Sequence, residues 1–207
     1  MNDIIKLSKM SGKLKNVPSI NTNTVTNDFC IKMNKSNNDK CICKYCYSHN
    51  MLNTFRKNCQ KSFQHNSNLL KTILSDNQLP IIKNNDILRI NSHGEIINDN
   101  HVRNIIKICE LNKNITVSLY TKRINIVNKV LDEIGYKPNN LIIVYSNPII
   151  DKPIDKKPSN KFYKYVDKIF NVLSTDNNKI NCDKNNCDNC RICYNKNKTN
   201  IIYEKIK

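Results

Sequence analysis

Strand-like and helix-like segments alternate through the middle of this chain. Short apolar runs typical of buried strands occupy residues 86–90 (DILRI), 115–121 (ITVSLYT) and 141–146 (LIIVYS). Amphipathic helical patterns at residues 101–111 and 123–135 separate them, so the strands start 29 and then 26 residues apart. A βαβ rhythm of this kind requires parallel strands joined by crossover helices. The spacing therefore predicts an α/β fold with a partial (β/α) barrel-like parallel sheet.

The segments on either side of this region carry weaker patterns. Residues 50–75 have Leu, Phe and Ile at helical spacing and are predicted to be helical. Residues 150–160 form a Pro- and Lys-rich loop, followed by a predicted helix at 161–169 and a short strand at 170–174. Gly135 is the expected C-terminal cap of the helix before the third strand.

A length of 207 residues suits one domain, predicted to span residues 1–207. Within it we distinguish an N-terminal cysteine motif (11–60), a β/α core (61–175) and a C-terminal cysteine-cluster segment (176–207). The chain has no apolar run of about 18 residues, which predicts no membrane span. The first 16 residues lack the apolar core of a secretory signal, so we expect a cytoplasmic protein in a reducing compartment.

The formal net charge is +17, from 34 Lys and Arg against 17 Asp and Glu. The chain also contains 38 Asn, 30 Ile and 29 Lys, but 5 Arg and no Ala. Residues with A/T-rich codons are thus abundant, and this bias is expected to fill neutral surface positions with Lys and Asn. A basic surface attracts nucleic acid nonspecifically, but Arg, the usual reader of bases and phosphates, is scarce. The charge alone is therefore a weak indicator of function.

Cysteine is a residue that the codon bias does not explain. Eight of the ten cysteines form two groups, Cys30, Cys41, Cys43 and Cys46 near the N-terminus and Cys182, Cys187, Cys190 and Cys193 near the C-terminus. Clustered thiols in a reducing compartment indicate metal binding or catalysis rather than disulfides. The other two lie apart: Cys59 is expected at a partly buried helix position, and Cys109 is expected in the core.

The first cysteine group combines a C-x2-C pair, Cys43 and Cys46, with Cys41 and Cys30 upstream. Thiolates held close together repel one another unless a cation compensates their charge. All four cysteines could complete a tetrahedral zinc site, whereas three of them could hold a [4Fe–4S] cluster with one open iron. The spacing leaves open whether Cys30 or Cys41 would be the third ligand.

The second cysteine group contains a C-x2-C-x2-C run from Cys187 to Cys193, with Cys182 five residues before it. Loops of bacterial ferredoxins wrap a [4Fe–4S] cluster with the same consecutive spacing. Zinc ribbons separate their two cysteine pairs by about a dozen or more residues. The spacing therefore favours iron and sulfur over zinc at this group.

Polar residues follow the predicted strands where the carboxyl ends of parallel strands meet. They are Ser92, His93, Gly94 and Glu95 after the first strand, Tyr120, Thr121, Lys122 and Arg123 at the second, and Ser146, Asn147 and Pro148 at the third. Gly94 would let the backbone approach a ligand closely, and Glu95 can accept hydrogen bonds from an ammonium group. His93 alone among the four histidines has a placement that indicates a role. We therefore predict a cofactor site formed by Ser92, His93, Gly94, Glu95, Tyr120 and Thr121.

Four short segments together follow the pattern of one known family. They are CKYCYS at 43–48, SHGE at 92–95, YTK at 120–122 and the terminal C-x2-C-x2-C run. On these segments the chain resembles the phage gene product 88 family, from about residue 11 to residue 203. The resemblance implies a phage-encoded protein that acts inside a host cell.

More distantly, the layout resembles radical S-adenosylmethionine enzymes. Those enzymes combine a partial (β/α) barrel, a cysteine triad whose last member follows an aromatic residue, and a GGE motif at the end of the second strand. Cys43 and Cys46 match the last two cysteines of the triad, and residues 93–95 (HGE) fall at the place of GGE. The usual triad would need a cysteine at Asp39, so Cys30 or Cys41 would serve instead.

This resemblance implies that three cysteines of the first group hold a [4Fe–4S] cluster and that Glu95 binds the ammonium group of S-adenosyl-L-methionine. The second group would hold an auxiliary cluster. The residues that would face the unidentified substrate are Ser92, Tyr120, Thr121 and Lys122. A contrasting interpretation is a non-enzymatic module that zinc stabilises at the cysteine groups and that binds nucleic acid through its basic surface.

Overall fold

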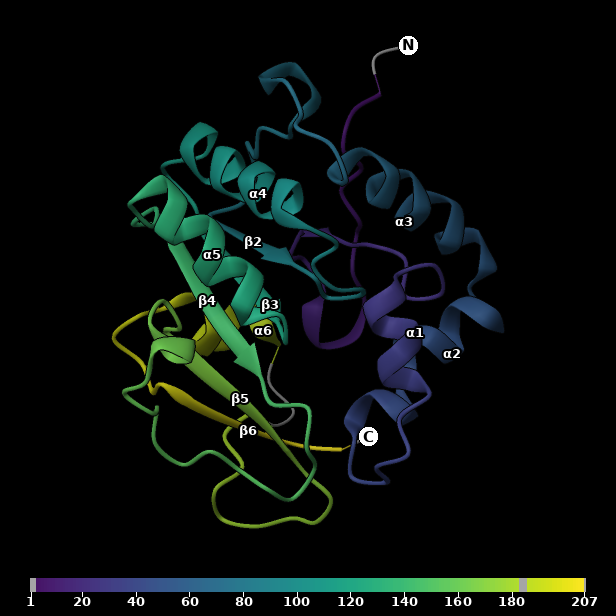
Figure 1. Cartoon of the computed structure of the whole chain (residues 1–207), viewed down its shortest axis with the longest axis vertical. Coiled ribbons are helices and arrows are strands. Elements are labelled where there is room, and N and C mark those ends of the chain that lie inside the picture. Colours follow the sequence, from purple (N-terminus) through teal and green to yellow (C-terminus); the bar gives the residue numbers. More distant parts are fainter. Residues whose placement is uncertain (1–2, 183–185, 207) are drawn as a thin grey trace.

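The computed structural model describes residues 3–182 and 186–206, so residues 183–185 of the predicted C-terminal segment lie outside it. Its centre is one sheet of six parallel strands (Figure 1). The strands are β1 (Ser19–Ile20), β2 (Ile87–Ile90), β3 (Thr116–Thr121), β4 (Leu141–Ser146), β5 (Lys168–Leu173) and β6 (Ile201–Lys205). The predicted parallel α/β sheet is therefore confirmed.

The order of the strands across the sheet is their order along the chain. Their register is regular, with Leu119 of β3 beside Ile143 of β4, for example. No pairing between the described residues joins β6 back to β1, so the sheet is open. The helices that connect β2 to β3 and β3 to β4 pack on the same face of the sheet, as right-handed crossovers require when the strand order does not reverse. The barrel-like part of the prediction stays a prediction.

The helices are α1 (Asp28–Asn34), α2 (Tyr47–Asn53), α3 (Lys57–Leu70), α4 (Asp99–Leu111), α5 (Ile124–Ile134) and α6 (Cys187–Cys190). Helix α4 begins after Asn98, whose side chain accepts a hydrogen bond from the His101 N–H. Helix α5 ends at Gly135, which has a φ of +85°, as expected for a left-handed cap. The apolar sides of α4 and α5 join Leu88 and Ile90 of β2 in the main core.

The C-terminal segment covers the opposite face of the sheet. Cys193 and Tyr194 lie in a single 3-10 turn, η5 (Ile192–Tyr194), and pack against Ile142 and Val144 of β4. Side chains alternate between the two faces of a strand, so Ile87 belongs to this second core whereas its neighbour Leu88 belongs to the first. The second cysteine group therefore packs on the face of the sheet opposite helices α4 and α5.

Two predicted helices differ from the structure. The helix predicted over 50–75 is broken at residues 54–56, between α2 and α3. The helix predicted over 161–169 is wrong: only residues 161–163 form a 3-10 turn, and β5 starts at Lys168. Apolar residues at 162, 165, 166 and 169 fit a helical period, but pairing of 168–173 with both neighbouring strands outweighs that local preference.

Asparagine, which the codon bias was expected to place on the surface, is also abundant in the interior. The buried asparagines among the described residues are Asn21, Asn23, Asn27, Asn66, Asn91, Asn104, Asn112, Asn147 and Asn171. Many donate side-chain hydrogen bonds to backbone carbonyls of other segments: Asn112, for example, donates to Pro80 at 2.9 Å. These amides satisfy the backbone groups of buried loops, which lack the regular hydrogen bonds of helices and sheets.

None of the described helices has the length and apolar character needed to cross a membrane.

Candidate functional site

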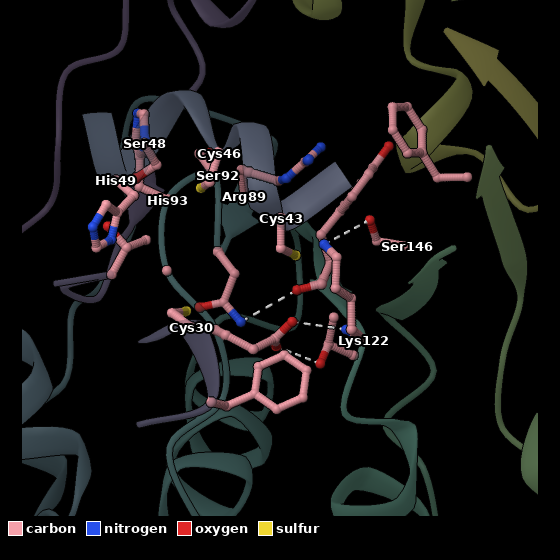
Figure 2. Close-up of a pocket in the computed structure, with 18 of the residues that line it drawn as sticks. Cys30, Cys43, Cys46, Ser48, His49, Arg89, Ser92, His93, Lys122 and Ser146 are labelled. Carbon is pink, nitrogen blue, oxygen red and sulfur yellow. Dashed lines mark hydrogen bonds between the residues drawn. The ribbon is translucent and has the colours of Figure 1, made fainter. Parts of the chain in front are cut away.

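A cavity of about 270 Å³ lies at the carboxyl edge of the sheet (Figure 2). Cys30, Cys43 and Cys46 line it, together with all six residues predicted to form a cofactor site: Ser92, His93, Gly94, Glu95, Tyr120 and Thr121. Figure 2 shows the three cysteines on different sides of the cavity, with Lys122 and Ser146 across from His93. Three of the four cysteines of the first group and the strand ends, predicted separately from the sequence, therefore line the same cavity.

Cys30 reaches the cavity from helix α1. The side chain of Asn27 caps this helix by accepting the Cys30 N–H at 3.2 Å. The same side chain donates to the backbone oxygen of Glu95 at 3.2 Å. One asparagine thus fixes both the start of α1 and its position against the 92–95 loop.

Cys41 lies outside the cavity although it is two residues from Cys43. It is 1% exposed and pairs with Ile149 in an isolated antiparallel bridge. Its Sγ donates to the backbone oxygen of Met33 at 3.8 Å. The sequence left the third thiol undecided between Cys30 and Cys41, and the structure places Cys30 beside Cys43 and Cys46.

The thiols of the cavity are held in a desolvated setting in which Lys122 and Glu95 act on their pKa values in opposite directions. Burial raises the pKa of Cys43 to about 11, against the lowering effect of Lys122. Burial and the nearby Glu95 raise the pKa of Cys30 well above its ordinary value. Burial alone would lower the pKa of Lys122, but the thiols and Glu95 raise it overall. These shifts favour the protonated form of both thiols, and a metal that binds them has to displace those protons.

Glu95 is 4% exposed, and its carboxylate joins two strand ends. Oε1 accepts from the Thr121 hydroxyl at 2.5 Å and from the Ile96 N–H at 2.8 Å, while Oε2 accepts from the Lys122 N–H at 2.8 Å. Burial raises the pKa of Glu95, which Lys122 and these hydrogen bonds oppose. Besides the predicted contact with a ligand, Glu95 therefore ties the loop after β2 to the end of β3.

Gly94 lines the cavity and is also needed for a contact within the chain, while its predicted role beside a ligand stays a prediction. Its φ is +86°, and a Cβ added there would lie 2.7 Å from the carbonyl carbon of Thr22. Thr22 cannot easily move, because its Oγ1 accepts the Glu95 N–H at 3.0 Å and its own N–H donates to the His93 oxygen at 3.1 Å. The loops after β1 and β2 are thus packed backbone to backbone.

The other residues of the 92–95 loop are also held by the chain. The hydroxyls of Ser92 and Ser19 are 2.7 Å apart. The His93 ring stacks on Phe63 with 5.4 Å between centroids. Burial lowers the pKa of His93 to about 4, so its imidazole is neutral at physiological pH.

At the end of β3, side chains point to different neighbours. The Tyr120 hydroxyl lies 2.8 Å from Cys193 Sγ, which connects this cavity to the second cysteine group. Lys122 Nζ donates to the Ser146 hydroxyl at 3.1 Å, across the cavity wall from β4. Tyr120 therefore makes a contact toward the second cysteine group, and Lys122 makes one toward the end of β4.

Buried polar atoms without partners concentrate at this cavity. Among the described residues, ten buried side-chain nitrogen or oxygen atoms have no hydrogen-bond partner, and six of them belong to residues that line it. Those six are Thr24 Oγ1, Ser48 Oγ, His49 Nδ1, Arg89 Nε, Asn91 Oδ1 and His93 Nδ1. Because buried polar groups are normally paired, by protein groups, water or a ligand, this concentration makes the cavity a candidate site for a polar ligand.

Several residues of the cavity had no predicted role, among them His49 and Arg89. His49 was expected to be an ordinary surface or core histidine, yet it lines the cavity with an unpaired Nδ1. Arg89 lies within a strand otherwise made of apolar residues, and strand alternation puts it on the face opposite Leu88 and Ile90. A charged residue inside the run DILRI was the signal available for it in the sequence.

The second cysteine group surrounds a much smaller cavity, of about 20 Å³. Its lining residues are Cys182, Cys187, Cys190, Arg191, Ile192, Cys193 and Ile202. Burial raises the pKa of Cys182 to about 12, and Lys13 Nζ lies 3.8 Å from its sulfur. As the side chains stand, no three or more His, Cys, Asp or Glu side chains in the described part of the chain are arranged to hold a metal ion.

Comparison with known proteins gives one match. A protein-family model described as Gene product 88 matches residues 6–196. No curated protein and no solved structure matches the chain.

Proposed function

The chain belongs to the gene product 88 family, and we propose that it binds an iron–sulfur cluster and works as a radical S-adenosylmethionine-type enzyme. The observation that carries the proposal is the shared cavity: Cys30 from α1 and Cys43 and Cys46 from the next segment line it with the 92–95 loop. A [4Fe–4S] cluster takes one thiolate per iron, so three thiols around a cavity suit a cluster with one open iron.

The lining of the cavity fits both the cluster and a polar cofactor. Lys122 places a cation among thiols that become anionic when they bind iron. The unpaired polar atoms of Thr24, Ser48, His49 and Asn91 provide hydrogen-bonding groups for a cofactor. When bound, the cluster supplies single electrons for the reductive cleavage of S-adenosylmethionine, and the chain's share is to bind, orient and exclude water.

Glu95 keeps capacity for the proposed contact with an ammonium group. A carboxylate offers about four lone-pair sites, and in Glu95 three of them accept hydrogen bonds from the chain. The site left over is on Oε2, which accepts only from the Lys122 N–H among the described residues. Glu95 would then have two tasks, to hold the loop and to orient the cofactor.

Iron content in cysteine variants tests the cluster. Anaerobic reconstitution of the wild-type protein is expected to give about four iron and four sulfide per chain at this site, with the broad visible absorption of a [4Fe–4S] cluster. We expect Cys43→Ser and Cys46→Ser to lose this iron, because neither serine supplies a thiolate. Cys41→Ser and Cys59→Ser are matched controls that should keep it, since Cys41 lies outside the cavity and Cys59 lies on α3.

Two results would contradict the proposal. One is a colourless protein that contains about two zinc atoms per chain, which would favour the zinc-stabilised, nucleic-acid-binding module. The other is a reconstituted, reduced protein that binds iron but leaves S-adenosylmethionine intact. An electron paramagnetic resonance spectrum of the reduced protein, recorded with and without S-adenosylmethionine, shows whether the cluster is present and whether S-adenosylmethionine binds to it.

For the second cysteine group the cavity size favours a single ion. A cavity of about 20 Å³ has room for about one water-sized atom, which suits zinc held by four cysteines better than a cubane cluster.

We predict that one equivalent of Co²⁺ added to the reduced protein gives thiolate-to-cobalt absorption, and that Cys190→Ser weakens it. Cys109→Ser, at a buried site in the main core, is the control. If this cysteine group held iron and sulfide and did not bind cobalt, it would be assigned to a second iron–sulfur cluster and not to zinc.

A further inference from the structure

Arg89 lies on β2, next to the edge strand β1, and lines the cavity described above. In the register of β2 it lies beside Ser19 of β1 and Ser118 of β3. Its neighbours Leu88 and Ile90 point into the helix-side core, so Arg89 lies on the opposite face. Figure 2 shows its guanidinium on the cavity wall above Cys43 in that view.

The guanidinium of the half-buried Arg89 stacks on an aromatic ring and lies near the acidic side chains of Tyr194, Cys187 and Cys193, but it forms no ion pair with a described carboxylate. Its central carbon lies 3.1 Å from the centroid of the Tyr120 ring. Its Nε is buried without a hydrogen-bond partner, and none of the ion pairs between described residues includes Arg89. An arginine stays charged at any physiological pH. A buried charge is costly unless an anion pairs with it.

The carboxylates of the cavity are already engaged elsewhere. Glu95 accepts three hydrogen bonds, from Thr121, Ile96 and Lys122, and its remaining acceptor site on Oε2 is the one proposed for the cofactor ammonium. Glu204 forms an ion pair with Lys13 at 2.8 Å. The second cation of the cavity, Lys122, directs its Nζ to the neutral hydroxyl of Ser146. Two cationic groups therefore face a space in which both carboxylates have other partners.

We propose that the substrate of this site carries an anionic group, a carboxylate or a phosphate, that Arg89 binds. Both groups present two oxygens to the planar fork of a guanidinium. Tyr120 holds that fork by stacking, and the Tyr120 hydroxyl is itself fixed by Cys193. The inference rests on the proposed function for the identity of the site, because it names the class of substrate that the cavity accepts.

Nuclear magnetic resonance of arginine Nε–H groups tests this directly, with inorganic phosphate and acetate as probes. Both are titrated into the full chain, before and after cluster reconstitution. We expect the Arg89 Nε–H resonance to shift saturably with at least one probe. Arg89→Lys keeps the charge but not the fork, and should weaken binding by about tenfold or more; Arg89→Gln should abolish it. Arg103→Gln, which removes a surface partner of Glu133, should change nothing.

Several outcomes decide the proposal. The stronger probe identifies the group as phosphate or carboxylate. An unmoved Arg89 resonance, or equal binding in the wild type and Arg89→Lys, would assign anion binding to surface lysines and overturn the proposal. A shift with S-adenosylmethionine alone would assign Arg89 to the cofactor and also overturn it. Anion binding that persists in Cys43→Ser, which lacks the cluster ligand, leaves this inference standing even where the proposed enzyme activity fails.

Discussion

Replacing Gly94 with alanine is expected to lower the free energy of unfolding by about 3 kcal/mol or more. Two costs add at this position. The φ of +86° is unfavourable for a residue with a side chain, and the new Cβ would overlap the backbone of Thr22. Thr22 is bonded to both His93 and Glu95, so the overlap can be relieved only by separating the loops after β1 and β2. We also expect reconstituted iron to fall, because this separation moves α1 and Cys30 away from the rest of the cavity.

Gly135→Ala is the matched control for this change. Its φ of +85° is almost the same, but no atom lies within 4 Å of an added Cβ. It should therefore cost only about 1 kcal/mol, the conformational part. Urea denaturation followed by circular dichroism measures both. Equal losses in the two variants would show that backbone conformation alone, and not the contact with Thr22, makes glycine necessary at position 94.

The central part of the fold could be read from periodicity because its pattern is local. The runs at 86–90 and 141–146 become β2 and β4, since each is buried on both faces of the sheet. The two edge strands carry no such signal. β1 is two residues long, and β6 follows the cysteine-rich segment with an alternation that reaches only five residues. Both are strands because of the neighbour that each pairs with, which no local pattern encodes.

The candidate site was predictable in its parts but not in its assembly. Parallel strands bring their carboxyl ends to one edge, which is why residues 92–95 and 120–121 could be grouped in advance. The choice between Cys30 and Cys41 depended on contacts far along the chain. Cys41 is taken out of the cavity by Ile149, more than a hundred residues later, and spacing between cysteines contains no information about that bridge.

The abundance of asparagine has a structural consequence that codon bias alone does not predict. A bias towards lysine and asparagine raises their number everywhere, and the surface was the expected place for both. Asparagine can also pair with backbone donors and acceptors at once, and in this chain it holds together loops that have few glycines to shape them. Selection acting on a biased composition can thus use an abundant residue in the interior.

Asn66 provides the strongest test of this view. It is fully buried on α3, where it accepts the Lys6 N–H at 2.9 Å and donates to the oxygens of Lys6 at 2.9 Å and Asn21 at 3.1 Å. Asn66→Ala leaves three backbone groups without this partner, the N–H and oxygen of Lys6 in part-buried contacts and the oxygen of Asn21 in a buried one, at about 1 kcal/mol each. The higher helix propensity of alanine returns about 0.5 kcal/mol. We therefore expect a net loss of about 2 to 3 kcal/mol in the free energy of unfolding.

Asn58→Ala, on the same helix but exposed, isolates the buried contacts. Because it gains helix propensity and loses no buried partner, its free energy of unfolding should stay equal or rise by about 0.5 kcal/mol. Amide hydrogen exchange adds a local measurement: protection of the Lys6 N–H should be lost in Asn66→Ala and kept in Asn58→Ala. If both variants unfolded at the same urea concentration, Asn66 would not contribute to stability by joining the N-terminal segment and the loop after β1 to α3. Codon usage would then be sufficient to explain why asparagine is abundant in this chain.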